Sequence, residues 1–197
     1  MSYVLMGLGN PGEEYEGARH NTGRFVVDRA RDRFGGEFKE DKKINALMSK
    51  GKIGKEVVIF AAPNTFMNKS GTAAVKLVKS KKAAERLIVI YDDFSLPLGR
   101  IKISFNRSSG GHNGLESVIK ALKTEAFVRI RVGIAPETAK GLAKAPHGDD
   151  KIIRFILGKY KPDELKILNK IAKEAVEAVE TIVKYGKEKA MSVYNTR

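Results

Sequence analysis

The chain has 197 residues, of which 42% are hydrophobic. This length and hydrophobic fraction are sufficient for a single domain with a buried core. It contains no cysteine, which excludes disulfides and thiolate chemistry, and no run of about 18 apolar residues, which argues against a membrane-spanning helix. Lys and Arg number 37 against 23 Asp and Glu; the resulting net charge of +14 fits either solubility or a polyanionic partner such as nucleic acid.

Strand and helix patterns alternate along the whole chain. In chain order we expect a strand at 3–8, a helix at 21–34, a hairpin of strands at 43–50 and 55–62 joined through Gly51 and Gly54, a helix at 69–80, strands at 86–91 and 99–105, a helix at 115–123, a strand at 128–135, a short helix at 151–157 and a long amphipathic helix at 162–184. This alternation predicts a single-domain, three-layer α/β/α fold with a twisted mixed sheet flanked by helices.

Two segments stand out from this pattern. The run Leu87-Ile88-Val89-Ile90 is uninterrupted and apolar, which is typical of a central strand buried on both faces, and we expect it to end at Asp92-Asp93. The stretch 136–149 has no periodicity, and loops of that length often act as lids. The N-terminus lacks the pattern of a secretory signal, so we expect a cytoplasmic protein.

Polar residues follow several of the predicted strands, where open α/β sheets place their ligands. His20 is the best candidate for a general base, and Asp92 could orient its ring as in a catalytic triad. No G-x-S-x-G nucleophile motif occurs, so water would be the nucleophile, oriented by the amides of Asn10, Asn68 and Asn113. Each of these residues could instead be a turn former, a helix cap or a solvated helix-start residue.

The motif Gly7-Leu8-Gly9-Asn10-Pro11-Gly12 fits G-x-G-x-x-G, which suggests a dinucleotide-binding turn and an oxidoreductase. A polar loop of about ten residues containing His20 separates it from the next helix, however, whereas a dinucleotide turn leads straight into one. We therefore interpret the glycines as residues that let the chain turn sharply at a strand end. We expect no metal site, because the three histidines lack paired metal-ligand spacing.

Five motifs, taken together and in order, resemble the bacterial peptidyl-tRNA hydrolase family over about residues 3–160. They are Gly-Leu-Gly-Asn-Pro-Gly (7–12), Arg-His-Asn (19–21) with Gly23, Thr-Phe-Met-Asn-Lys-Ser-Gly (65–71), Asp92-Asp93 with Leu-Pro-Leu-Gly (96–99), and Gly-Gly-His-Asn-Gly (110–114). The resemblance implies a monomeric enzyme that needs no cofactor and cleaves the ester between a peptide and the terminal ribose of tRNA. From the absence of a long apolar run we expect no membrane partner.

The resemblance also implies roles for individual residues. His20 is similar to the family's general base, Asp92 to the residue that stabilises its basic form, and Asn10 to the residue that favours peptidyl-tRNA over unblocked aminoacyl-tRNA. The positions similar to the family's substrate and tRNA contacts, with their supporting neighbours, are Tyr15, Phe66, Met67, Asn68, His112 and Asn113, and those similar to its phosphate contacts are Lys102 and Arg131.

Two positions depart from the family pattern. Ala18 stands where a threonine is common, which implies a lost hydroxyl near the base, and Ser104 stands where a lysine is common. For the missing lysine, Arg107 and Arg129 are candidate substitutes. A catalytically silent RNA-binding relative is the alternative function, although the presence of both His20 and Asp92 argues against it.

Overall fold

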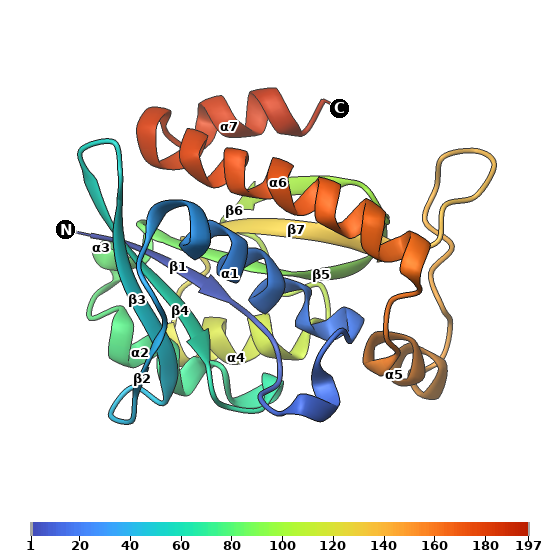
Figure 1. Cartoon of the computed structure of the whole chain (residues 1–197), viewed down its shortest axis with the longest axis horizontal. Coiled ribbons are helices and arrows are strands. Elements are labelled where there is room, and N and C mark those ends of the chain that lie inside the picture. Colours follow the sequence, from blue (N-terminus) through green and yellow to red (C-terminus); the bar gives the residue numbers. More distant parts are fainter. Residues whose placement is uncertain (1, 197) are drawn as a thin grey trace.

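The structure, a computed structural model that describes residues 2–196, contains a seven-stranded mixed sheet between two layers of helices (Figure 1). The strands are β1 (Tyr3–Gly7), β2 (Lys39–Asp41), β3 (Ala46–Ile53), β4 (Glu56–Pro63), β5 (Leu87–Pro97), β6 (Ile101–Phe105) and β7 (Val128–Ala135). They lie in the order β2-β3-β4-β1-β5-β7-β6. The strands β4, β1, β5 and β7 are parallel, and the pairs β2–β3, β3–β4 and β6–β7 are antiparallel. The three-layer α/β/α fold predicted from the sequence is confirmed.

Two sets of helices cover the two faces of the sheet. One face is covered by α1 (Thr22–Phe34), α6 (Pro162–Tyr185) and α7 (Lys187–Tyr194), and the other by α2 (Gly71–Leu77), α3 (Lys81–Ala84) and α4 (Asn113–Leu122). The remaining helix, α5 (Asp149–Leu157), lies at the edge of the molecule (Figure 1), and short 3-10 turns occur at η1 (Glu13–Tyr15), η2 (Arg19–Asn21) and η3 (Met67–Lys69). Within residues 2–196, no helix is long and apolar enough to cross a membrane.

Strand β5 lies at the centre of both apolar cores. Ile88 and Ile90 pack with α1 and α6, whereas Leu87 and Val89 pack with α2 and α4. The strand is apolar at every position of this run because both of its faces are buried, as the sequence indicated. The strand does not end at Asp92-Asp93 as expected, because both residues pair with β7 and the strand continues, through an irregularity in register, to Pro97.

Two glycines bring α1 close to the sheet. A Cβ atom on Gly23 would lie 2.2 Å from the carbonyl oxygen of Ile90, and one on Gly7 would lie 2.3 Å from the carbonyl oxygen of Gly23. Gly7 therefore allows α1 to pack close to the strand, and our interpretation of it as a turn residue is wrong. Within this motif only Gly12, with a φ of 106°, has the left-handed backbone conformation that favours glycine. The turns η1 and η2 separate Gly12 from α1, unlike a dinucleotide-binding turn.

Other differences from the predicted elements lie at the ends of strands and helices and in short elements. The first hairpin strand begins at Ala46 and extends to Ile53, so Gly51 pairs with Val58 inside the ladder and does not join the strands. The helix expected at 69–80 is shorter and is followed by a separate helix, α3. The short strand β2 and the last helix α7 were not predicted. The loop predicted at 136–149 is present up to α5.

Candidate active site

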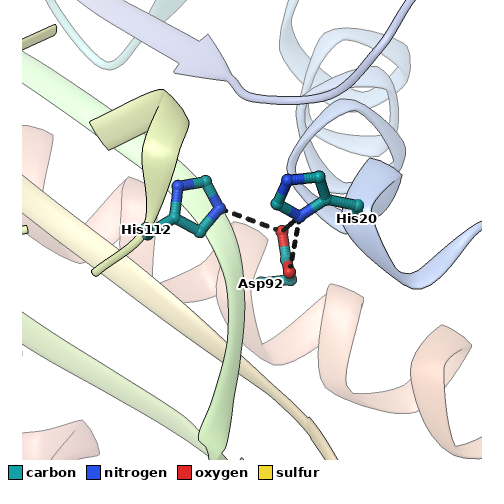
Figure 2. A group of neighbouring side chains, drawn as sticks. All are labelled: His20, Asp92 and His112. Atoms are coloured by element: carbon teal, nitrogen blue, oxygen red, sulfur yellow. Dashed lines mark hydrogen bonds and ion pairs between the residues drawn. The ribbon is translucent and has the colours of Figure 1, made fainter. Parts of the chain in front are cut away.

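The side chain of His20 contacts Asp92, a residue of β5 that lies 72 positions away in the sequence (Figure 2). Nδ1 of His20 lies 2.9 Å and 3.1 Å from the two carboxylate oxygens, and both residues are buried. A carboxylate can only accept hydrogen bonds, so Nδ1 carries the proton and the lone pair of neutral His20 is on Nε2. Because the ring lies in the wall of a crevice, this arrangement suits a general base.

His112 contacts the same carboxylate from the other side (Figure 2). Its Nε2 lies 3.2 Å from Asp92 Oδ1, and its Nδ1 accepts the backbone N–H of Leu115 at the start of α4. The bond from Leu115 leaves Nε2 as the nitrogen that carries the proton, so His112 donates to Asp92. The family resemblance implied that His112 supports the substrate wall beside Asn113, and it did not indicate the contact with Asp92.

The electrostatics of His20 and Asp92 favour their charged forms. Burial lowers the pKa of His20, but the charge of Asp92 and the hydrogen bond to it outweigh burial and raise that pKa above its ordinary value of 6.5. Burial raises the pKa of Asp92, yet the two histidines more than reverse this and lower it well below its ordinary range. Asp92 is therefore ionised near neutral pH.

A crevice of about 470 Å³ brings together residues from four parts of the chain. Besides His20 it is lined by Asn10, Phe66, Met67, Asn68 and Asn113, all of them predicted site residues, and by Lys69, Ile153, Ile156 and Leu157. Tyr15, also predicted, meets the ring of Phe66 edge to face with centroids 6.5 Å apart. Tyr15 thus lies next to Phe66 at the edge of the crevice, and the other predicted residues named here line the crevice itself.

Asn10 is held in place by two neighbours. Its Oδ1 accepts the backbone N–H of Met67 at 2.7 Å, while Asn21 bonds its backbone N–H at 2.8 Å and its carbonyl oxygen at 2.9 Å. The bond from Met67 turns the Asn10 amide oxygen toward the protein, and among residues 2–196 its NH2 group donates to no partner, so this group can donate to a ligand. Sequence reasoning used Asn21 only as part of a motif and missed this contact.

A larger groove of about 700 Å³ lies beside the crevice, with Asp92 and His112 in its wall. Lys102, Arg107 and Arg131 also line it; Lys102 and Arg107 are exposed, whereas Arg131 donates to Asp93 Oδ2 at 2.6 Å. Arg129 is fully buried, and its guanidinium bonds the carbonyl oxygens of Arg107 and Phe127. Arg129 is thus unavailable as a substitute for the missing lysine, and Arg107 stays a candidate.

One group of side chains in the described part of the chain could hold a metal ion. His20, Asp92 and His112 each offer one ligand atom, and these atoms lie within 4.8 Å of one another. The spacing of the histidines in the sequence could not indicate this group, because its members come from η2, β5 and the residue before α4. The same atoms already form the hydrogen bonds described above.

Comparison with known proteins identifies the family. A profile of the family described as peptidyl-tRNA hydrolase matches residues 4–197. The chain belongs to the peptidyl-tRNA hydrolase family.

Relatives and solved structures agree with this assignment. The chain is 42% identical over 194 residues to a peptidyl-tRNA hydrolase of Caldanaerobacter subterraneus, covering 98% of the chain and 99% of the relative. It is 37% identical over 195 residues to that of Aquifex aeolicus, covering 98% and 95%. The crystal structure of the Arg119Gln mutant of peptidyl-tRNA hydrolase from Acinetobacter baumannii superposes with a TM-score of 0.87 at 28% identity, covering 98% of this chain and 94% of that one.

Proposed function

We propose that this member of the peptidyl-tRNA hydrolase family hydrolyses the ester between a peptide and the terminal ribose of tRNA, and so recycles tRNA from stalled or aborted translation. The observation that carries the proposal is the buried His20–Asp92 pair in the wall of an open crevice. A chain without cysteine and without a serine nucleophile motif has water as its natural nucleophile, and His20 would activate it.

In this mechanism Nε2 of His20 takes a proton from water as the water oxygen attacks the ester carbonyl carbon. The carbonyl becomes an oxyanion, and the imidazolium is stabilised by ionised Asp92. When the tetrahedral intermediate collapses, the bond to the ribose oxygen breaks and His20 returns its proton to that oxygen. The products are a tRNA with a free ribose hydroxyl and a peptide with a free carboxylic acid, which releases its proton to solvent near neutral pH.

The asparagines that line the crevice would orient the substrate. The free amide NH2 of Asn10 and the exposed amides of Asn68 and Asn113 can donate to the oxyanion or to peptide carbonyls. Asn10 would also favour blocked peptidyl groups over a free amino group. Phe66 and Met67, with Tyr15 behind Phe66, would form the apolar part of the substrate site, and His112 would support the wall by holding Asp92.

The larger groove is where we place the tRNA. Exposed Lys102 and partly exposed Arg131 would contact its phosphates, with Arg107 as a further cation, and the net charge of +14 favours such a polyanion. His20 lines the crevice and bonds Asp92, which lines the groove, so both cavities lie next to this pair, as a substrate with a nucleic-acid part and a peptide part requires.

Hydrolysis of peptidyl-tRNA by purified wild type and His20→Ala tests the proposal. His20→Ala should lose at least about a hundredfold in turnover, the usual contribution of a general base, and keep its tRNA affinity. Turnover near the wild-type level would refute the base assignment, and an inactive wild type would favour the catalytically silent RNA-binding alternative.

We further propose that the protein acts as a monomer in the cytoplasm, where translation supplies its substrate. A mass of one chain measured by light scattering would support the monomer.

A further inference from the structure

The crevice around His20 has an apolar border, and most of its members take no part in the reaction steps described above. Among the described residues eight large apolar side chains are exposed, and three of them line this one crevice: Phe66 (55% exposed), Ile153 (51%) and Leu157 (43%). Ile156, which is half-buried, lines it as well. We call these four residues the apolar rim. Exposed apolar side chains gathered at one cavity indicate contact with an apolar ligand.

The rim is unusual because helix α5, which supplies three of its members, has no fully buried residue, and only Phe155 and Ile156 pack, partly buried, against the core. An amphipathic helix normally turns its apolar side toward the core. In α5 the apolar residues Ile153 and Leu157 are instead exposed at a cavity that also holds His20, and Ile156 lines the same cavity.

Arg19 fixes the C-terminal end of α5 next to the catalytic turn. Its guanidinium donates to Glu164 at 2.8 Å and to the carbonyl oxygen of Lys159 at 3.1 Å, and it stacks on the ring of Phe155 at 4.7 Å. Its backbone N–H donates to the carbonyl oxygen of Gly158 at 3.0 Å. Because Arg19 directly precedes His20, these charge-assisted contacts hold the rim at a fixed place relative to the base.

We propose that the apolar rim binds apolar side chains of the peptide next to the ester, so that peptidyl-tRNAs ending in apolar residues are bound more tightly than those ending in glycine. The proposal rests on the function proposed above. Asparagine amides can hold any peptide backbone, so the rim is the part of the crevice that can distinguish one side chain from another. A volume of about 470 Å³ leaves room for one or two such side chains beside the ester.

The test compares one tRNA that carries either N-acetyl-dileucine or N-acetyl-diglycine. Wild type should show a KM roughly three- to tenfold lower for the leucine substrate than for the glycine substrate. This ratio is smaller than the discrimination of an enclosed apolar pocket, because the rim is open to solvent. Ile153→Ser should remove most of this difference by raising KM for the leucine substrate alone, and Ile153→Leu should keep it.

Ile167→Ser is the matched control, because Ile167 is an isoleucine of helix α6 with 43% exposure and does not line the crevice. It should keep the wild-type preference. Equal KM values for the two substrates in wild type, or an unchanged preference in Ile153→Ser, would overturn the rim. Failure of wild type to hydrolyse even the glycine substrate would instead overturn the proposed function, so the two failures are distinguishable.

Discussion

Replacing Asp92 by asparagine should remove most of the catalytic activity while leaving the crevice in place. Asp92 accepts from His20 Nδ1 at 2.9 and 3.1 Å and from His112 Nε2 at 3.2 Å. An asparagine has one acceptor oxygen and one NH2 donor, so it cannot accept from both histidines at both oxygens. If its NH2 group faces Nδ1, the proton of His20 is forced onto Nε2 and the base is lost.

The size of the loss follows from this geometry. The equivalent aspartate-to-asparagine change in a serine protease triad lowers kcat by about 10⁴ through the wrong tautomer, and general bases contribute about 10² to 10⁴. We expect kcat for Asp92→Asn to fall by about 10³, which corresponds to roughly 4 kcal/mol of transition-state stabilisation. KM should change little, because Asp92 lies behind His20 and is almost completely buried, so it offers the substrate little contact.

The pH dependence gives an independent check. His20 must be neutral to act as a base, so activity should rise with pH through a pKa above the ordinary 6.5, since Asp92 raises it. Without the charge of Asp92 only burial is left, and burial lowers the pKa of a histidine. The acid limb of kcat for Asp92→Asn should therefore lie at lower pH than that of wild type.

The assay is peptide release from peptidyl-tRNA over pH 5–9 (roughly the range in which histidine titrates), with thermal unfolding to verify that the variant is folded. Asp93→Asn is the control, because Asp93 is the next residue and bonds Arg131 instead of His20. It should keep kcat within about threefold, as expected of a group that leaves the base intact. A value of kcat for Asp92→Asn within tenfold of wild type would refute the reasoning.

Two further predictions concern the groove and the metal question. Lys102→Ala and Arg131→Ala should each weaken tRNA binding and reduce the slope of log affinity against log salt concentration by about the value of one phosphate contact. The loss of affinity should be larger for Lys102→Ala, because Asp93 partly neutralises Arg131. Unchanged slopes would place the phosphates elsewhere. Peptidyl-tRNA hydrolysis should survive an excess of chelator, and loss of activity that added metal restores would instead assign a metal to His20, Asp92 and His112.

The sequence could predict much of the fold because its helices and its long strands carry strong local patterns. Strand β7 (Val128–Ala135) and helix α1 have nearly the predicted bounds, because alternation and helical periodicity extend over many residues there. Helix α7 was missed because it follows α6 after Gly186 and its pattern is short and weak. The extension of β5 beyond Asp93 was missed because it depends on pairing with β7.

The candidate site could be predicted in the same partial way. Its members Asn10, His20, Asn68 and Asn113 were identified from motifs, and the structure gathers them in one crevice. The part played by Arg19 was not predicted, since its partner Glu164 lies 145 positions away. A buried arginine between two helices leaves no local sequence signal.

The sequence by itself determined the family, the fold class with most of its strands and helices, and the residue types available for chemistry, because motifs and periodicity are properties of neighbouring residues. Only the tertiary structure decided that His20 and His112 share one carboxylate, that Arg129 is buried away from any phosphate and that α5 presents an uncovered apolar side to the crevice. Those facts depend on strand pairing and packing between segments far apart in the chain, and local pattern does not specify which distant surfaces meet.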